Sequence, residues 1–391
     1  MNNQIRAGVI GLGILGGQHA RYLNEREDVD LVAVCDLRED VAAQTANELG
    51  AVGFTDLREM LSGHSLDLVT VATPDPMHRA PSVAAIEAGV PNIIQEKPMA
   101  TTMEDARAIA DAVDKSGARF FMNFANRASE MDIATRYIIQ EGLLGRVVYG
   151  ESRLDDNVSV PTQMWGDRSK EFAGGSSTAH FLLSHVVDLL RFYFSPAEVI
   201  EVYAISQEEV LGYTPDVYDA FLTFDSGLKV RVKAEWIKHI DGLVEFYTSF
   251  SGSEGTIIYN KRPSFAAEEG WRANLSSEVS PEDLLRHQQA LSTKGVNVSA
   301  LRHCPEPSTG DLSAGGGEQV HSLEHRGQSH GGTMAIVGPI IAAIQEGTDE
   351  PDCWKGNCPL PNHLDGLKQT ETVDAIVRSS RENRVIVVRD A

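Results

Sequence analysis

Three short stretches of this 391-residue chain place polar side chains where they could do chemistry. In one of them Glu96, Lys97 and Pro98 follow directly on the apolar run 92–95. A lysine at the end of a buried strand can hydrogen-bond an oxygen that gains or loses a proton. Glu96 can orient a ligand or pair with a cation, and Pro98 can fix the turn through a cis peptide bond. The competing interpretation is a solvated surface turn.

The second stretch is rich in glycine and has the spacing Gly11-x-Gly13-x-x-Gly16. An apolar strand precedes it, a helical pattern follows, and Asp36 ends the next strand. This context predicts a dinucleotide site, in which the pyrophosphate meets the start of a helix and Asp36 binds the ribose hydroxyls of NAD. Arg38 weakens the preference for NAD, so NADP remains an alternative. The residues predicted to line the site are Gly11, Leu12, Gly13, Ile14, Leu15, Gly16, Asp36, Leu37 and Arg38.

The third stretch is the apolar segment 177–194, in which His185 and Asp188 are three residues apart. This spacing puts both side chains on one face of a helix, and Asp188 is expected to orient His185 or to cap a neighbouring segment. A single histidine on such an apolar helix is more often a core residue. The segment alone therefore does not establish a catalytic role.

The elements that must position these residues follow from the pattern of apolar residues. Up to about residue 125, short apolar runs alternate with helical patterns, which predicts βαβ units around a parallel sheet. Longer alternating runs at 146–155 and 218–237 then predict a mostly antiparallel sheet. The predicted fold is α/β, with a doubly wound Rossmann domain at 1–125 and an α+β domain at 126–391. The Pro-, Gly- and Ser-rich residues 261–328 predict a long irregular insertion, with 324–330 as a lid or an oligomer contact.

The composition narrows the class of protein further. A formal charge of −22 argues against a nucleic-acid partner. No run of 18 apolar residues and no leader pattern are present, so neither a membrane span nor secretion is expected. Four cysteines in so long a chain favour a reducing, cytoplasmic setting. The histidines and cysteines lack the compact pairs of a zinc site, so no metal is expected.

Taken together, the motifs resemble the Gfo/Idh/MocA family, which includes glucose-fructose oxidoreductase, inositol dehydrogenase and their rhizopine-catabolism relatives. The matching pieces are "GLGILGGQHA", "VCD", "VATPDPMH", "QEKPMA", "NFANR", "SHVVDLLRFYF" and "VDAIVRSSRENRVIVV", and they cover most of the chain outside 261–328. The resemblance implies a Rossmann domain, a second domain with an open sheet, and hydride exchange between NAD(P) and a sugar or cyclic polyol. It also implies cofactor contacts at Thr73, Pro74, His78, Glu96, Lys97 and Asn126.

The resemblance also implies that His185 is a general base beside Lys97, so Lys97, His185 and Asp188 are the predicted catalytic residues. One position departs from the family pattern. Many inositol-type members carry an aspartate four residues before this histidine, and here the position is Phe181. Proton handling therefore depends on Lys97 and His185 alone or on a different carboxylate.

Further substrate contacts are expected from the strand that ends near residue 157. Arg153, Asp155 and Asn157 are predicted to lie over the same cleft as His185, and Trp165 can stack on a sugar ring or on nicotinamide. Each of the four can equally belong to a solvated loop.

The predicted function is an NAD-dependent dehydrogenase that acts on a secondary hydroxyl or ketone of a sugar, a glycoside or an inositol-like cyclic polyol. The alternatives are an NADP-linked reductase, a dehydrogenase for a cyclic dihydrodiol, and an enzyme that keeps and recycles its cofactor. A non-catalytic NAD(H) sensor is the alternative from another class. The expected partners are a small-molecule substrate and further copies of the chain in a dimer or tetramer.

Overall fold

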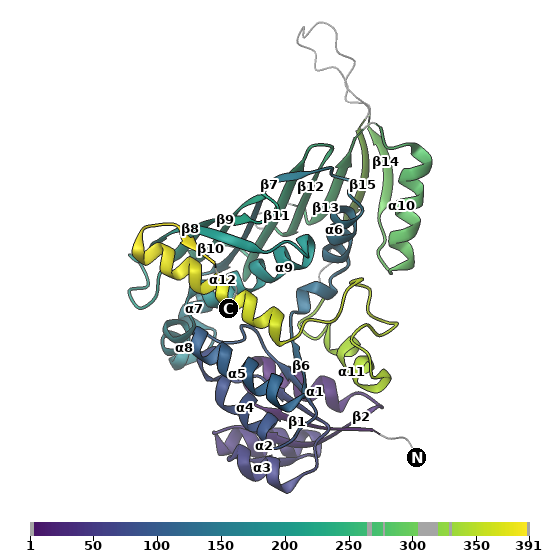
Figure 1. Cartoon of the computed structure of the whole chain (residues 1–391). Helices are drawn as coiled ribbons and strands as arrows, with labels where there is room; N and C mark the ends of the chain where they lie inside the picture. The colour runs from purple at the N-terminus through teal and green to yellow at the C-terminus, as the bar shows by residue number, and fades with distance from the viewer. Residues whose placement is uncertain (1–3, 264–267, 277, 304–319, 328–330, 389–391) are drawn as a thin grey trace, which may run out of the picture.

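The computed structural model describes residues 4–263, 268–276, 278–303, 320–327 and 331–388. They form two sheets, one of six strands and one of ten, with helices packed between and beside them (Figure 1). In the described part of the chain, no helix is both long enough and apolar enough to cross a membrane.

The first sheet is parallel throughout and has the order β3-β2-β1-β4-β5-β6. Apart from the edge strand β3, its strands are short apolar runs that are largely buried on both faces, as expected where helices cover both sides of a parallel sheet. The strands are β1 (Ile5–Ile10), β2 (Val29–Cys35), β3 (Val52–Phe54), β4 (Leu68–Val71), β5 (Asn92–Gln95) and β6 (Arg119–Met122). The helices between them are α1 (Ile14–Asn24), α2 (Glu39–Leu49), α3 (Leu57–Gly63), α4 (Arg79–Glu87) and α5 (Met103–Ser116), with the short turns η1 (Asp75–Met77) and η2 (Ala125–Ala128).

The second sheet is antiparallel except for the parallel pair of β7 and β10. Its strands, in spatial order, are β14 (Ser299–His303), β15 (Val320–Arg326), β13 (Gly270–Leu275), β12 (Gly255–Arg262), β11 (Val244–Gly252), β7 (Val147–Asn157), β10 (Lys229–Lys238), β9 (Val217–Phe224), β8 (Val199–Gln207) and β16 (Ile386–Val387). The predicted fold class, a Rossmann domain followed by an α+β domain on a large antiparallel sheet, is confirmed.

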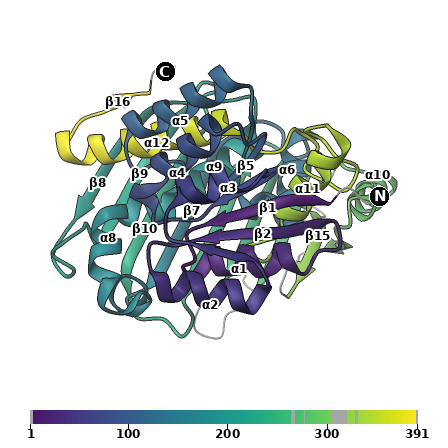
Figure 2. The ribbon, with the colours of Figure 1, turned by 90° about the horizontal axis from the view of Figure 1, so that it is seen from below.

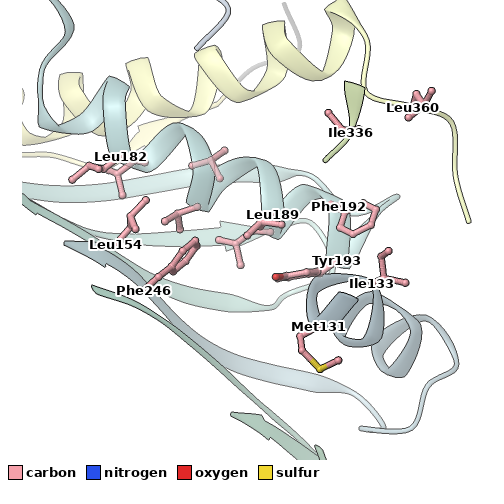
Figure 3. Close-up of a cluster of buried hydrophobic side chains, with 14 of the residues drawn as sticks. Met131, Ile133, Leu154, Leu182, Leu189, Phe192, Tyr193, Phe246, Ile336 and Leu360 are labelled. Atoms are coloured by element: carbon pink, nitrogen blue, oxygen red, sulfur yellow. The ribbon is translucent and has the colours of Figure 1, made fainter. Parts of the chain in front are cut away.

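Helices cover one face of this second sheet. The helical elements of this part of the chain are α6 (Glu130–Gln140), α7 (Ser159–Gln163), η3 (Gly166–Arg168), α8 (Ser169–Ser176), the π-helical turn η4 (Ala179–Leu183), α9 (Ser184–Phe194), α10 (Pro281–Thr293), α11 (Val337–Glu346) and α12 (His363–Glu382). Of these, η4, α9, α10 and α12 contact strands of the second sheet, whereas α11 is hydrogen-bonded to Arg119 of the first sheet. The close-up in Figure 3 shows Leu182 and Leu189 on the η4–α9 segment above Leu154 of the sheet. Alternate residues of the strands point into this core, and the others lie on the opposite, open face.

The predicted irregular insertion at 261–328 is wrong for most of its described residues. Strands β13, β14 and β15 extend the second sheet there, and helix α10 packs beside β14 and β15. The cause is visible in β13, where Trp271, Ala273 and Leu275 are buried and alternate with partly exposed residues. Pairing with neighbouring strands outweighs the local Gly and Pro content. Residues 304–319 and 328–330 lie outside the described part, so the idea of a lid at 324–330 stays a prediction.

The end of the chain returns to the first sheet. The Arg119 guanidinium on β6 donates hydrogen bonds to the carbonyls of Ala343, at 2.8 Å, and Thr348, at 2.6 Å, beside α11. Helix α12 contacts α5 of the first domain as well as β8 and α9 of the second. Seen from below, α12 crosses behind α5 and α4 (Figure 2). The segment 331–362 packs against the first sheet although it lies far beyond residue 126 in the chain. The predicted domain boundary at 125/126 remains a prediction.

Candidate active site

The glycine-rich turn between β1 and α1 has the geometry that a dinucleotide requires. Gly11 has a φ of +86°, and a Cβ there would lie 2.7 Å from the Ala72 carbonyl oxygen. A Cβ on Gly16 would lie 1.7 Å from the Gly11 oxygen, so this close approach of helix and strand needs glycine. Gly13 has no atom within 4 Å of its Cβ position, and no side chain caps α1. The open space and the free N–H groups at the start of α1 therefore fit a pyrophosphate.

Asp36 lies at the end of β2, beside this turn. The Leu12 N–H donates to Asp36 Oδ2 at 2.8 Å, and the Arg38 guanidinium binds both carboxylate oxygens at 2.9 and 3.0 Å. Burial alone would raise the pKa of Asp36, but the hydrogen bonds from Arg38 and the backbone hold it below its ordinary value. The predicted pair of Asp36 and Arg38 is therefore an ionised carboxylate next to a partly exposed guanidinium.

The turn after β5 is built on Glu96, which is buried. Its Oε1 lies 2.8 Å from His19 Nε2 on α1 and accepts a hydrogen bond from Asn123 Nδ2 at 2.5 Å. Burial would raise the pKa of Glu96, yet His19, Asn123 and Lys97 together lower it. Glu96 is buried and its Oε1 is bound by two protein side chains, so it supports the turn, and its predicted contact with a cofactor stays a prediction. The Lys97–Pro98 peptide bond is cis, as expected for this turn.

Lys97 leaves this turn and reaches the second domain. Its side chain is largely buried, with 6% of the residue exposed. The ammonium donates to the Phe181 carbonyl oxygen at 3.3 Å and lies 4.0 Å from the centre of the Phe181 ring. Phe181 stands where the family resemblance leads one to expect an aspartate in many inositol-type members, and here Lys97 makes a cation–π contact with it.

Three other predicted cofactor positions lie on the segment after β4. The buried ring of His78 lies 2.7 Å from the Pro98 carbonyl oxygen and 2.9 Å from that of Thr73. Both ring nitrogens face the backbone, so His78 joins two loops and its side chain is not directed at a ligand. Thr73 and Pro74 stay at the surface of the same loop, with the Thr73 hydroxyl bonded to the Met77 carbonyl oxygen at 3.2 Å.

His185 is the second residue of α9, which follows directly on the π-helical turn η4. Turns of this kind often occur at functional sites. The Asn126 Nδ2 group lies 3.1 Å from His185 Nδ1, and Asn126 Oδ1 accepts a hydrogen bond from Lys261 at 2.8 Å. The amide of Asn126, predicted to contact a cofactor, is thus engaged by two protein side chains.

The expected contact between Asp188 and His185 is not formed. The Asp188 carboxylate instead accepts three hydrogen bonds from Arg127, the shortest at 2.6 Å, and Arg127 also donates to Asp365 at 3.0 Å. Burial works against the Arg127 charge, but Asp188 and Asp365 raise its pKa above the ordinary value. A cation buried between two carboxylates is a stronger partner for Asp188 than an imidazole on its own helix. Asp188 therefore ties α9 to η2 and α12.

Trp165 belongs to an aromatic cluster next to Lys97. Its ring is stacked on Phe172 with 3.9 Å between the centroids, and it meets the edge of Phe181 at 5.7 Å. Phe181 also packs on Trp236, at 5.6 Å. Trp165 is partly exposed, so its position agrees with a stacking contact for a ring beside Lys97.

The predicted contacts on β7 point to the wrong face of the sheet. Arg153 pairs with Glu245 at 2.8 Å, and Asp155 pairs with Lys238 at 2.8 Å on the open face. Asn157 donates to the Ile240 carbonyl oxygen at 2.6 Å. Successive residues of a strand alternate between faces, so these odd-numbered positions cannot share the face of Leu154, which packs under α9.

The residue of β7 that does face the helices is Asp156, which the sequence analysis missed. It is 2% exposed, and its Oδ2 accepts a hydrogen bond from Trp236 Nε1 at 3.1 Å. Burial raises the pKa of Asp156 to about 7, and the nearby Lys97 ammonium opposes the rise. The signal was present in the sequence, because Asp156 follows the apolar Leu154 by two positions.

Lys261 was also missed, although β12 carries the same kind of signal. Ile257, Tyr259 and Lys261 alternate on the buried face of this strand, and Lys261 is 2% exposed. The pattern thus puts a lysine among inward-facing residues. Within the described ranges, no group of three or more His, Cys, Asp or Glu side chains is arranged to hold a metal ion.

Lys97, His185 and Asp156 form the centre of the candidate site. They come from both domains. Burial is the main cause of the pKa shifts of His185 and Asp156, and the Lys97 ammonium lowers the pKa of His185 further and opposes the rise in the pKa of Asp156. The arrangement offers a cation, an imidazole and a carboxylate that titrates near neutral pH. Such a set can bind an oxygen and exchange its proton.

Both parts of the chain are similar to proteins of one known family. Residues 5–124 match the model of an oxidoreductase family with an NAD-binding Rossmann fold, and residues 133–258 match the GFO/IDH/MocA C-terminal domain. The chain is 30% identical over 212 residues to the D-glucoside 3-dehydrogenase of Escherichia coli (strain K12), over 54% of this chain and 59% of that protein. It is 30% identical over 229 residues to the inositol 2-dehydrogenase of Acidothermus cellulolyticus, over 56% of this chain and 62% of that protein.

The matched stretches thus span less than two thirds of these relatives' length. Over the whole chain, the fold is similar to that of a levoglucosan dehydrogenase solved with NADH and levoglucosan. The TM-score is 0.73 at 21% identity, and the match covers 99% of this chain and 100% of that one. The two domain matches together take in most of the sequence, and the chain therefore belongs to the Gfo/Idh/MocA family of oxidoreductases, with its NAD-binding Rossmann domain and its C-terminal domain.

Proposed function

We propose that this protein is an NAD-dependent dehydrogenase that acts on a secondary hydroxyl, or the corresponding ketone, of a sugar, a glycoside or a cyclic polyol. The observation that carries the proposal is the position of Lys97. Its ammonium leaves the end of a Rossmann strand and lies beside Phe181, within electrostatic range of His185 and Asp156. Ligands of such sheets bind beyond the carboxyl ends of the strands, where Lys97 lies.

The residues that would hold NAD are the glycine turn at 11–16, Asp36 and the loop at Thr73 and Pro74. The N–H groups at the start of α1 bind the pyrophosphate, and Asp36 binds the adenosine ribose. When bound, the nicotinamide supplies the acceptor or donor of a hydride. NAD is favoured over NADP because an ionised Asp36 repels a 2′-phosphate, although Arg38 lies beside it.

The protein's own side chains handle the oxygen and its proton. Lys97 donates a hydrogen bond to the substrate oxygen and stabilises the negative charge that develops when the O–H bond breaks. Asp156 accepts the proton in the oxidative direction and returns it in the reductive one. A group whose pKa is about 7 suits this exchange near neutral pH. His185 supplies a second hydrogen bond to the same oxygen.

The proposed class of substrate rests on three kinds of support. Trp165 and Phe172 offer aromatic surface of the kind that stacks on a sugar ring. Carboxylate and imidazole groups at the centre of the site suit hydroxyl groups. The relatives include proteins named D-glucoside 3-dehydrogenase and inositol 2-dehydrogenase.

The experiment that tests the proposal is a screen for reduction of NAD⁺ and NADP⁺, followed by absorbance, with inositols, aldoses, glycosides and cyclic diols. We expect turnover with a cyclic polyol or a sugar and with NAD⁺. Turnover with cyclic diols only would assign the dihydrodiol alternative. Tight NAD binding without turnover on any member of the panel would refute the proposal and favour the sensor or an enzyme that recycles its cofactor.

A further inference from the structure

The buried lysine of β12 has no place in the proposed reaction, yet it is connected to His185. Its ammonium lies 2.5 Å from Asp132 Oδ2 on α6 and 2.8 Å from Asn126 Oδ1 on η2. The other oxygen of Asp132 accepts a hydrogen bond from the Tyr193 hydroxyl. Lys261 is therefore ion-paired and has only protons to offer to its neighbours.

This cation decides how the amide of Asn126 is oriented. An ammonium can face the carbonyl oxygen of an amide but not its NH₂ group, since both would be donors. With Oδ1 directed to Lys261, Nδ2 is directed to His185 Nδ1 at 3.1 Å. The orientation, which is often ambiguous for an asparagine, is fixed here by chemistry.

The amide in turn decides where the proton of His185 lies. The NH₂ group of Asn126 can only donate, so His185 Nδ1 must accept and cannot carry a proton. A neutral imidazole then has its N–H at Nε2. An imidazolium would instead place its Nδ1–H group against the NH₂ group of Asn126, and both are donors. Among the residues that the structure describes, none is hydrogen-bonded to His185 Nε2. The Nε2–H group is therefore available to a ligand.

We infer that Lys261, acting through the Asn126 amide, holds His185 in its Nε2–H tautomer, so that His185 donates a hydrogen bond to the reacting oxygen and is not the base that removes its proton. Lys261 and Asn126 are positioning residues in this scheme. The inference rests on the proposed function only for the identity of that oxygen. It departs from the role of general base that the family resemblance implies for His185.

The charges around His185 agree with a neutral ring. Burial lowers the pKa of His185 well below its ordinary value, and Lys97 from the β5 turn and Lys261 and Arg262 from β12 lower it further. The carboxylate on its own helix, Asp188, is engaged by Arg127 and does not offset them. We therefore expect His185 to stay neutral at mildly acidic pH, where an ordinary histidine takes up a proton.

The test reads the tautomer directly in the full-length protein, without substrate or cofactor. Histidine labelled with nitrogen-15 gives two-bond correlation patterns that differ between the Nδ1–H, Nε2–H and doubly protonated rings. The signals of His185 are those, among 12 histidines, that disappear in His185→Gln. We expect the Nε2–H pattern at neutral and mildly acidic pH. An Nδ1–H or doubly protonated pattern at neutral pH would overturn the inference.

Two variants test the positioning chain itself. Asn126→Asp places a second acceptor at the same position, so the tautomer should invert to Nδ1–H, with a raised pKa for His185. Lys261→Met removes the cation, so a mixture of tautomers is expected. Lys233→Met, in a lysine of the open face that pairs with Asp155, should leave the Nε2–H pattern unchanged. If Asn126→Asp keeps the Nε2–H pattern, the role of Asn126 is wrong.

The outcome remains decisive if a variant does not fold, because the spectrum of the natural protein alone can contradict the inference. It is also separate from the activity screen. Absence of turnover together with the Nε2–H pattern would count against the proposed function and leave the tautomer assignment in place. Turnover together with an Nδ1–H pattern would overturn the tautomer assignment and leave the proposed function in place.

Discussion

At the scale of single residues, the proposed chemistry depends most on Lys97. Replacing it by alanine should lower turnover by about 100- to 10,000-fold, the range of general acid–base and hydrogen-bond contributions. NAD binding, measured by calorimetry, should change little, because the glycine turn and Asp36 hold the cofactor elsewhere. Lys115→Ala on α5, where the lysine side chain is 79% exposed, is the matched control. Turnover close to that of the natural protein in Lys97→Ala would refute the assigned role.

Asp156 should set the pH dependence of the reaction. The carboxylate must be ionised to accept a proton, so oxidation should speed up as the pH rises through about 7. Asp156→Asn should not show this rise in rate, and above that pH it should be slower than the natural protein. Asp219→Asn, on the open face, is the control and should keep the rise. A rise that persists in Asp156→Asn would show that another group takes the proton.

The same residue makes a second, thermodynamic prediction. Its folded-state pKa lies above that of an ordinary aspartate, so the protonated form is the one that favours folding. The stabilisation is fully present below the ordinary aspartate pKa of 3.8 and is lost progressively as the pH rises from there to about 7. The melting temperature of Asp156→Asn relative to the natural protein should therefore rise across this interval and stay constant above it. Calorimetry at about pH 4 and about pH 8 measures the difference.

Asp36 should decide between the two nicotinamide cofactors. Asp36→Ala removes the carboxylate and frees Arg38 for a 2′-phosphate, so the ratio of kcat/KM for NADP to that for NAD should rise about ten- to a hundredfold. Asp40→Ala, in an exposed residue of α2, should change the ratio little. An unchanged ratio in Asp36→Ala would mean that the ribose is bound by other groups.

Not every residue of the site could be predicted from its place in the sequence. Asp36 and Lys97 each end a strand of a recognisable βαβ pattern, and local spacing is enough to find them. The partner of Asp188 could not be found, because Arg127 lies 61 residues away and meets it only when α9 packs on η2. Lys261 is 135 residues from Asn126 and looks like a surface lysine until its strand is paired.

At the scale of elements, the sequence predicts which residues form a strand more reliably than it predicts the face of the sheet to which each side chain points. A shift of one residue moves a whole set of side chains to the other face of a sheet. Arg153, Asp155 and Asn157 were assigned to the site for this reason, although Asp156 is the residue on that face. The prediction of an irregular insertion at 261–328 was wrong for a different reason. Its strands form only by pairing with one another and with β12.

Asp188 makes a prediction at this scale, because it joins elements. Asp188→Asn should reduce the free energy of unfolding by about 3 kcal/mol, the lower end for a broken buried pair, since Arg127 keeps its contact with Asp365. Urea titration measures the loss. Asp374→Asn, in a half-buried pair with Arg378 on α12, should change it by less than about 1 kcal/mol. Equal effects of the two substitutions would contradict a structural role for Asp188.

At the scale of the whole molecule, the open face of the ten-stranded sheet is the surface on which a homo-oligomer should form. Exposed apolar side chains line this face at Tyr149, Tyr203, Ile205, Phe221 and Ile258. Tyr203 and Phe221 lie directly opposite each other on β8 and β9. Surfaces of this kind are commonly covered by a second copy of the same chain.

Phe221→Glu should therefore lower the molar mass of the protein in light scattering toward that of a single chain. The expected cause is a charge placed within an apolar contact. Leu285→Glu, which changes a more exposed apolar residue on α10, should leave the molar mass unchanged. A single-chain mass for the natural protein would contradict the predicted dimer or tetramer.

The path of α12 has a consequence for how the enzyme can move. The Asn362 backbone, at the start of this helix, bridges to Phe121 of the first sheet, and the helix then runs to β8 of the second. Lys97 belongs to the first domain, and His185 and Asp156 belong to the second, so α12 connects the two halves of the candidate site. Because α12 contacts both domains, we expect no hinge-like opening between them. Substrate entry and product release must then depend on movements of loops and side chains. Substitutions that weaken the contacts of α12 should slow catalysis although they lie outside the candidate site.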